Sequence, residues 1–194
     1  DQIGGVSPSI GTPHAYVSKL NELQSRAKIP LLVTADFENG GPGMRINGSF
    51  ALPSMLPQGG GTDFPPTMAF GAIGDERFAY EYGRITAREA RATGVHFLFS
   101  PVLDVNSNPE NPVIATRSFG ADPELVARMG AAFIRGAHDG GALTTGKHFP
   151  GHGDTSTDSH IGIPVVRADR KRLDDLELAP FQVAIDEGVD AIMT

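Results

Sequence analysis

The stretch from Lys147 to His160 holds the densest group of chemically versatile side chains in the sequence. Its fourteen residues include three of the six histidines of the chain, two aspartates, one lysine and four residues with hydroxyl groups. Such groups titrate near neutral pH or hydrogen-bond to ligands that are rich in hydroxyls. We therefore expect catalysis or ligand binding in this stretch.

His160 and Asp158 are candidates for a proton-transfer pair. An imidazole changes charge near neutral pH, so it can deliver a proton and recover it. A carboxylate two residues away can fix the tautomer and orientation of the ring, provided that the loop turns tightly. The plainer alternative is a surface histidine that happens to lie near an aspartate.

A second group of charged residues follows the ends of expected strands. Its members are Asp36, Arg117, Lys147 and His148. A carboxylate can accept hydrogen bonds from sugar hydroxyls, and Arg and Lys can donate to sugar oxygens, so the group would suit a carbohydrate. Each of these residues taken singly could also be an ordinary surface charge. Asp104 is interpreted as a capping or loop residue rather than a catalyst.

A metal site is an alternative use of the same region, because imidazole and carboxylate groups bind zinc or iron. The four candidate ligands are His148, His152, Asp154 and His160. The spacing of His148 and His152 places both rings on one face only in a helix, and Pro150 with Gly151 excludes a helix there. We therefore expect neither a metal nor a cofactor. His152 and Asp154 could instead hydrogen-bond to the loop backbone and shape it.

Short apolar runs alternate with helical patterns along the chain. The expected strands cover residues 3–7, 29–35, 95–99, 142–146 and 189–194, and the expected helices begin near residues 13, 75, 123 and 169. This alternation predicts right-handed βαβ units and a parallel sheet. Lys147 and His148 then stand at the carboxyl end of a strand, which is the edge where parallel α/β folds bind ligands. Residues 40–67 are rich in Gly and Pro, and their apolar side chains favour an ordered flap over this edge.

Composition excludes several classes of protein. A net charge of −7 argues against a nucleic-acid surface, and no apolar run is long enough to cross a bilayer. The absence of cysteine excludes disulfides and thiol nucleophiles, but it leaves the compartment open. The chain begins without Met or a signal peptide and resembles an excised segment.

A complete (β/α)₈ barrel typically takes ~250 residues. We therefore predict that residues 1–194 are part of such a TIM-barrel-type fold, with the first and last βα units missing. An open flavodoxin-like sheet is the rival fold. That fold should carry a phosphate-binding loop after its first strand, and no such fingerprint is present.

The segment Lys147–Thr155, KHFPGHGDT, followed by Asp158–His160, DSH, resembles the signature of family 3 glycoside hydrolases of the β-N-acetylglucosaminidase (NagZ-like) branch. Supporting similarities lie at residues 36–41, 100–104, 112–114 and 117–120, so they span nearly the whole chain. The resemblance implies a (β/α)₈-type barrel and retaining hydrolysis of terminal β-linked N-acetylglucosamine, here from peptidoglycan fragments. It also implies that His160 with Asp158 is the acid/base, and that Asp36, Arg117, Lys147 and His148 bind the sugar.

Two departures from the family pattern matter. Pro42, Gly43 and Met44 intervene where the family usually has an arginine, so no role is carried onto Arg45. The family nucleophile is an aspartate after a later strand, beyond Thr194, and we therefore expect the 194-residue chain alone to be inactive. The alternatives are a family 3 β-glucosidase, whose branch normally lacks the Asp-Ser-His segment, a non-catalytic carbohydrate-binding relic, and a metal-dependent hydrolase.

Overall fold

The computed structural model describes residues 3–8, 12–40, 61–158, 160–166 and 168–194, and these residues contain five short parallel strands. The strands are β1 (Gly5–Val6), β2 (Leu32–Ala35), β3 (Phe97–Leu98), β4 (Thr145–Lys147) and β5 (Ala191–Met193). β2 pairs with β1 and β3, and β4 pairs with β5. Parallel bridges from Phe97 to Leu143 and from Val102 to Lys147 join the two groups. The strands therefore lie side by side in chain order.

This strand order distinguishes the two predicted folds. A flavodoxin-like sheet reverses its order next to the first strand, because its helices wind in two directions. The described strands show no such reversal and succeed one another as neighbouring strands do in the wall of a (β/α)₈ barrel. The prediction of a TIM-barrel-type α/β fold is confirmed.

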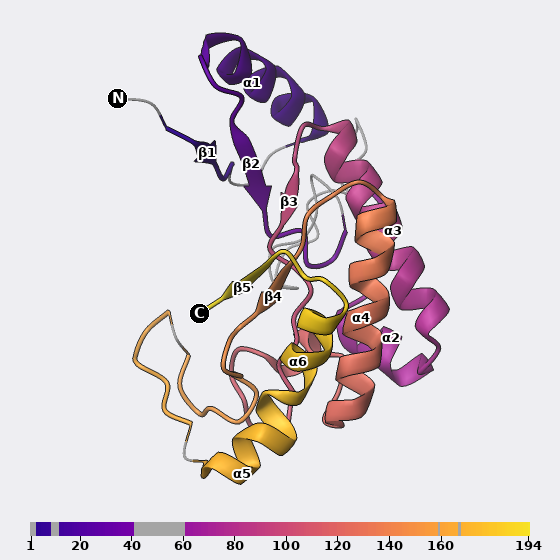
Figure 1. Ribbon diagram of the computed structural model, residues 1–194, viewed down its shortest axis with the longest axis vertical. Coiled ribbons are helices and arrows are strands. Elements are labelled where there is room, and N and C mark those ends of the chain that lie inside the picture. The colour runs from indigo at the N-terminus through magenta and orange to yellow at the C-terminus, as the bar shows by residue number, and fades with distance from the viewer. Residues whose placement is uncertain (1–2, 9–11, 41–60, 159, 167) are drawn as a thin grey trace.

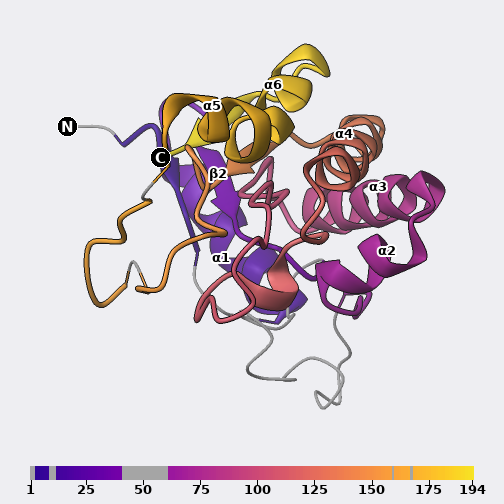
Figure 2. The same cartoon turned by 90° about the horizontal axis from the view of Figure 1, so that it is seen from below.

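The helices α2, α3 and α4 form a group on one side of the strands, α6 lies beside α4, and α1 lies apart from them near β2 (Figures 1 and 2). Their bounds are α1 (Pro13–Arg26), α2 (Thr67–Ile73), α3 (Glu76–Ala92), α4 (Pro123–Asp139) and α6 (Ala179–Asp186). Side-chain oxygens of Thr12, Asp75 and Asp122 accept backbone N–H groups at the first turns of α1, α3 and α4. The predicted starts of these three helices are therefore correct.

Glycines allow α3 and α4 to pack closely. A Cβ on Gly83 of α3 would lie 2.2 Å from the carbonyl oxygen of Phe133, and a Cβ on Gly136 of α4 would lie 2.0 Å from that of Tyr80. The buried face of α3 is accordingly built from small residues around Tyr82, whose ring stacks on Phe70 at 4.6 Å. The close packing of α3 against α4 holds α4 in place, together with the loop that precedes α4 at the candidate site.

Several local expectations were wrong. Apolar spacing in the sequence places Val17 on the apolar face of α1 and Phe78 on that of α3, but these side chains are 37% and 49% exposed. The helix α2 was not predicted, and most of the expected flap, residues 41–60 with Arg45, lies outside the described residues. The last predicted helix, expected over about residues 169–187 with a break at Pro180, is divided into α5 (Arg170–Arg172), the π-helical turn η3 (Leu173–Glu177) and α6, which begins at the expected break. No helix in the described part of the chain has the length and apolarity to cross a membrane.

Candidate active site

Lys147 is the last residue of β4, and its ammonium group lies between two carboxylates that follow β2. Nζ is 2.9 Å from Oδ1 of Asp36 and 2.6 Å from Oε1 of Glu38. The Lys147 side chain is only 2% exposed, whereas that of Asp36 is 71% exposed. Asp36 therefore presents the accessible edge of the ion cluster, while the ammonium group is enclosed.

The turn at Phe37 places both carboxylates beside Lys147. Phe37 has a φ of 44°, in the left-handed region that bulky residues seldom occupy, and its ring lies 6.0 Å from that of Tyr16. Strained backbone of this kind persists where the surrounding packing imposes it, and it is frequent at functional sites. The packing on α1 thus helps to hold Asp36 and Glu38 in position.

Arg117 completes the ion cluster from the opposite side. It ends the short helix η2 (Ala115–Arg117), and its Nη2 and Nε lie 2.6 and 2.8 Å from the two oxygens of Glu38. Burial alone would raise the pKa of Glu38, but the charges and hydrogen bonds of Lys147 and Arg117 outweigh that effect and lower this pKa to about 2. Glu38 therefore stays ionised and joins the two cations.

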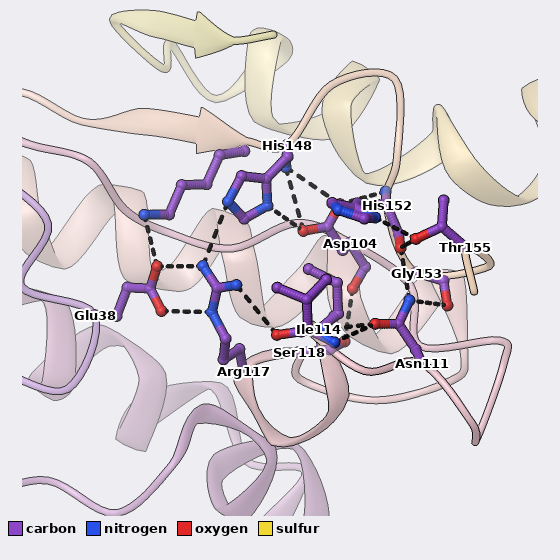
Figure 3. A network of polar contacts seen from close by, with 12 residues as sticks. Glu38, Asp104, Asn111, Ile114, Arg117, Ser118, His148, His152, Gly153 and Thr155 are labelled. Atoms are coloured by element: carbon purple, nitrogen blue, oxygen red, sulfur yellow. Dashed lines mark hydrogen bonds and ion pairs between the residues drawn. The ribbon is translucent and has the colours of Figure 1, made fainter. Parts of the chain in front are cut away.

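His148 is oriented by Asp104. Nδ1 of His148 lies 2.7 Å from Oδ2 of Asp104, and the same carboxylate accepts the backbone N–H of His148 at 3.2 Å and that of His152 at 2.7 Å. Nε2 of His148 faces Nη2 of Arg117 at 3.4 Å. Figure 3 shows the resulting continuous network from Glu38 through Arg117 and His148 to Asp104. Asp104 does cap loop backbone, as predicted, but it also positions a site histidine, which sequence reasoning missed.

Asn111 connects the loop of Arg117 to the glycine-rich segment after β4. Its Nδ2 donates to the carbonyl oxygens of His152 and Gly153 at 2.8 and 3.1 Å. Its Oδ1 accepts the backbone N–H groups of Val113 and Ile114 at 2.9 and 2.7 Å (Figure 3). One buried amide thus ties together two loops that are distant in sequence.

His152 has a structural environment. Its ring contacts the hydroxyl of Thr155, and burial lowers the pKa of the imidazole. Asp154 pairs with Arg172 at 2.9 Å. Both contacts are with side chains and not, as predicted, with the loop backbone, although they do hold the two residues within the loop. Within the described residues, no three His, Asp or Glu side chains are grouped as metal ligands.

His160 and Asp158 form a hydrogen-bonded pair in the long loop between β4 and α5. Nδ1 of His160 lies 2.6 Å from Oδ1 of Asp158, which also accepts the backbone N–H of His160 at 2.9 Å. Both hydrogen bonds lower the pKa of Asp158, and the bond from the backbone N–H has the larger effect. The His160 side chain is 69% exposed, and its loop projects away from the helices in both views (Figures 1 and 2).

The structure therefore brings the six predicted residues together in two groups. Asp36, Arg117, Lys147 and His148 meet at the carboxyl ends of β2 and β4, joined by Glu38. Asp158 and His160 pair with each other in the projecting loop. Glu38 was not selected from the sequence, although its place two residues after Asp36 at a strand end was a usable signal.

The strand order defines a segment of a parallel α/β barrel, and the polar cluster lies at the carboxyl ends of its strands, the edge at which such barrels bind ligands. Residues 14–194 match the profile of the Glycosyl hydrolase family 3 N terminal domain. The chain belongs to this family. The fold and the resemblance seen in the KHFPGHGDT segment agree with that assignment.

Relatives and solved structures support the family and the fold. The chain is 36% identical over 203 residues to a β-hexosaminidase of Thiobacillus denitrificans, covering 98% of this chain and 52% of the relative. It is 32% identical to a β-N-acetylglucosaminidase/β-glucosidase of Cellulomonas fimi, covering 98% and 32%. The structure of a family 3 β-N-acetylglucosaminidase from Paenibacillus sp. str. FPU-7 has a TM-score of 0.88 and 44% identity, covering 99% and 36%. The chain thus spans about half or less of the length of these proteins.

Proposed function

We propose that these 194 residues are part of a retaining exo-β-N-acetylglucosaminidase that removes terminal β-linked N-acetylglucosamine from glycans such as peptidoglycan fragments. The observation that carries this proposal is the ion cluster at the carboxyl ends of β2 and β4, which precedes a loop with a hydrogen-bonded histidine and aspartate. Relatives named β-hexosaminidase and β-N-acetylglucosaminidase support the same activity.

In the proposed site, the sugar hydroxyls bind at the accessible edge of the cluster. Asp36 accepts hydrogen bonds from sugar hydroxyls, while Arg117 and His148 bind sugar oxygens beside it. Lys147 has two of its ammonium donors directed at Asp36 and Glu38, so its direct share is at most a single hydrogen bond. Its larger contribution is to fix the two carboxylates.

His160 acts as the acid/base in two steps. Its imidazolium first gives a proton to the glycosidic oxygen, while a carboxylate attacks the anomeric carbon and the aglycone leaves. The neutral imidazole then takes a proton from water, whose oxygen displaces the carboxylate and releases the sugar. Asp158 holds the ring and its tautomer. Because His160 is exposed, its loop must turn toward the bound sugar for either step.

We assign the nucleophile to an aspartate outside these 194 residues, as the family resemblance implies, and the two buried carboxylates of the site fit this assignment. Both oxygens of Glu38 are bound to cations, and the Asp104 carboxylate is buried among three N–H groups. Neither is free to form a covalent bond to a sugar. The chain alone should then not hydrolyse an aryl N-acetylglucosaminide, and robust turnover by the purified 194-residue chain would contradict this assignment.

Leaving-group dependence in the full-length protein tests the acid/base. Replacing a general acid costs about 10²- to 10⁴-fold when the leaving group needs a proton, and much less for an activated aryl glycoside. His160→Ala should therefore slow hydrolysis of a disaccharide far more than that of 4-nitrophenyl N-acetylglucosaminide. His14→Ala, at an exposed histidine of α1, is the matched control. Asp158→Asn should reproduce the His160→Ala pattern, and the double variant should be no slower than the slower single one.

A β-glucosidase is the second candidate, because the Cellulomonas fimi relative carries both activities in its name. Rates on matched aryl N-acetylglucosaminides and aryl glucosides decide between the two. A preference for the glucoside would overturn the proposed specificity. Sugar binding without turnover by the full-length protein would instead support a non-catalytic relic, and loss of activity on chelation would support a metal-dependent hydrolase.

A further inference from the structure

The loop that carries Asp158 and His160 has its two ends close together. Asp154, where the loop leaves the glycine-rich segment, and Asp169, where the chain enters α5, line one groove together with Arg172. The guanidinium of Arg172 lies 2.9 Å from Oδ2 of Asp154, and the backbone N–H of Arg172 donates to Oδ1 of Asp169 at 2.8 Å. A single residue thus contacts both ends of the loop.

Arg172 is in turn tied to a buried carboxylate. Nη2 of Arg172 lies 3.4 Å from Oε1 of Glu177, the last residue of the π-helical turn η3 and only 1% exposed. π-Helical turns are rare and frequently occur at functional sites. Glu177 packs against Gly151, where a Cβ would lie 2.8 Å from the Glu177 Cβ, and Gly151 precedes His152, which Asp104 holds. Contacts therefore run from the loop ends to the ion cluster.

The described apolar side chains in the middle of the loop are exposed and are not held by packing. Ile161 and Ile163 are 86% and 89% exposed, and Val165 is also largely exposed. Side chains so exposed do not fix the direction of a loop by packing. The direction in which His160 points must then be set mainly at the loop ends.

We propose that Arg172 is a positioning residue that ties both ends of the loop to each other and to Glu177, and so sets the direction from which His160 reaches the sugar. This inference rests on the proposed function for its catalytic meaning, but its structural part stands alone. Arg172 does not touch the sugar and acts through the position of His160.

Loop position is tested first, in the full-length protein and without any substrate. These 194 residues contain no cysteine, so spin labels can be placed at Ile163→Cys and Arg88→Cys once any cysteine elsewhere is replaced. Arg172→Gln should broaden the distribution of distances between the labels. Arg170→Gln, which removes an exposed ion pair between α5 and Asp174 of η3, should leave it unchanged. An unchanged distribution in Arg172→Gln would overturn the proposal.

A second variant covers the case in which Arg172→Gln fails to fold because Glu177 loses its partner. Asp154→Asn removes the ion pair between Arg172 and Asp154 and leaves the contact between Arg172 and Glu177 in place. It should broaden the same distribution. A narrow distribution in Asp154→Asn would also overturn the proposal.

Kinetics then test the catalytic meaning. A misplaced catalytic group can cost about 10²-fold, so Arg172→Gln should slow a disaccharide substrate by roughly 10- to 100-fold relative to an activated aryl glycoside. It should cause no further loss in the His160→Ala background. Equal losses on both substrates, or additive losses, would show that Arg172 does not act through His160. If the wild-type protein hydrolysed neither substrate, the proposed function would fail while the label distances would still decide the role of Arg172.

Discussion

Asp104 holds His148 in a single orientation, with Oδ2 of the carboxylate 2.7 Å from Nδ1 of the ring. A carboxylate can only accept here, so Nδ1 carries the proton and Nε2 is left as an acceptor that faces Arg117. The same carboxylate accepts the backbone N–H groups of His148 and His152. Asp104 therefore sets both the tautomer of the ring and the path of the chain that follows β4.

Asp104→Asn should release His148, because an amide has a single acceptor oxygen and its NH₂ group only donates, so the three N–H groups that the carboxylate accepts can no longer all be bound. Hydrogen bonds to charged groups contribute about 1.5–3 kcal/mol, so kcat/KM of the full-length protein on an N-acetylglucosaminide should fall roughly 10- to 100-fold. The ¹⁵N chemical shifts of the His148 ring should change from values typical of one tautomer to values typical of a mixture of the two. Ser118→Ala is the control, since its hydroxyl donates to the Asp104 backbone carbonyl at 2.6 Å and leaves the carboxylate intact. Unaltered His148 shifts in Asp104→Asn would contradict this role.

Loss of charge at Asp36 should affect sugar binding, whereas loss of charge at Glu38 should affect stability, although the two residues lie only two positions apart. Asp36→Asn alters an exposed group, its amide oxygen can still accept from Lys147, and Glu38 still neutralises the ammonium, so the loss of stability should be about 1 kcal/mol or less while sugar binding is lost. Glu38→Gln leaves Arg117 and Lys147 buried without a shared anion, which should cost roughly 3–5 kcal/mol of stability. Denaturant unfolding and kcat/KM, both measured on the two variants of the full-length protein, check this prediction. A large stability loss in Asp36→Asn would contradict the distinction.

The ionisation of Glu38 predicts how stability depends on pH. Its pKa is about 2 in the folded protein against an ordinary 4.5, the effect of burial being outweighed by Lys147 and Arg117. A carboxylate with a lowered folded pKa stabilises the fold fully above its unfolded pKa, and this stability is lost as pH falls toward the folded pKa. The free energy of unfolding should therefore drop more steeply between about pH 4.5 and 2 in wild type than in Glu38→Gln. Parallel curves in that range would show that Glu38 does not provide this stability.

The sequence predicts the fold well because strand order and strand ends follow from local patterns. Apolar runs, helix N-caps such as Thr12 and Asp122, and the polar residues after each run are local signals, and the expected strand positions agree with β1 to β5 to within a few residues. The π-helical turn before α6 has no local signal. Its geometry depends on how Glu177 packs against Gly151, which is a tertiary contact.

The site is predictable to a different degree. Side chains of the types that bind sugars can be selected from the sequence, and this selects Asp36, Arg117, Lys147 and His148. The structure places these four residues in one network. The residues that hold them, Glu38 and Asp104, read as ordinary loop carboxylates, because nothing in the sequence shows that both are buried against cations or N–H groups. Whether His160 approaches the cluster depends on the loop ends at Arg172, and spacing alone carries no information on that contact.

Asn111 offers a test of how the two loops of the site are joined, because its two ends bind different loops. Asn111→Asp keeps an acceptor for the N–H groups of Val113 and Ile114, but it places a carboxylate oxygen against the carbonyl oxygens of His152 and Gly153. Asn111→Ala removes both sets of contacts. Repulsion between unpaired acceptors should make Asn111→Asp at least as destabilising as Asn111→Ala, and each should lose about 2–4 kcal/mol, since unsatisfied buried groups cost about 1–3 kcal/mol each. Thermal and denaturant unfolding of both variants check the order. An Asn111→Asp protein with wild-type stability would show that the contact with the glycine-rich segment is not needed to hold the site together.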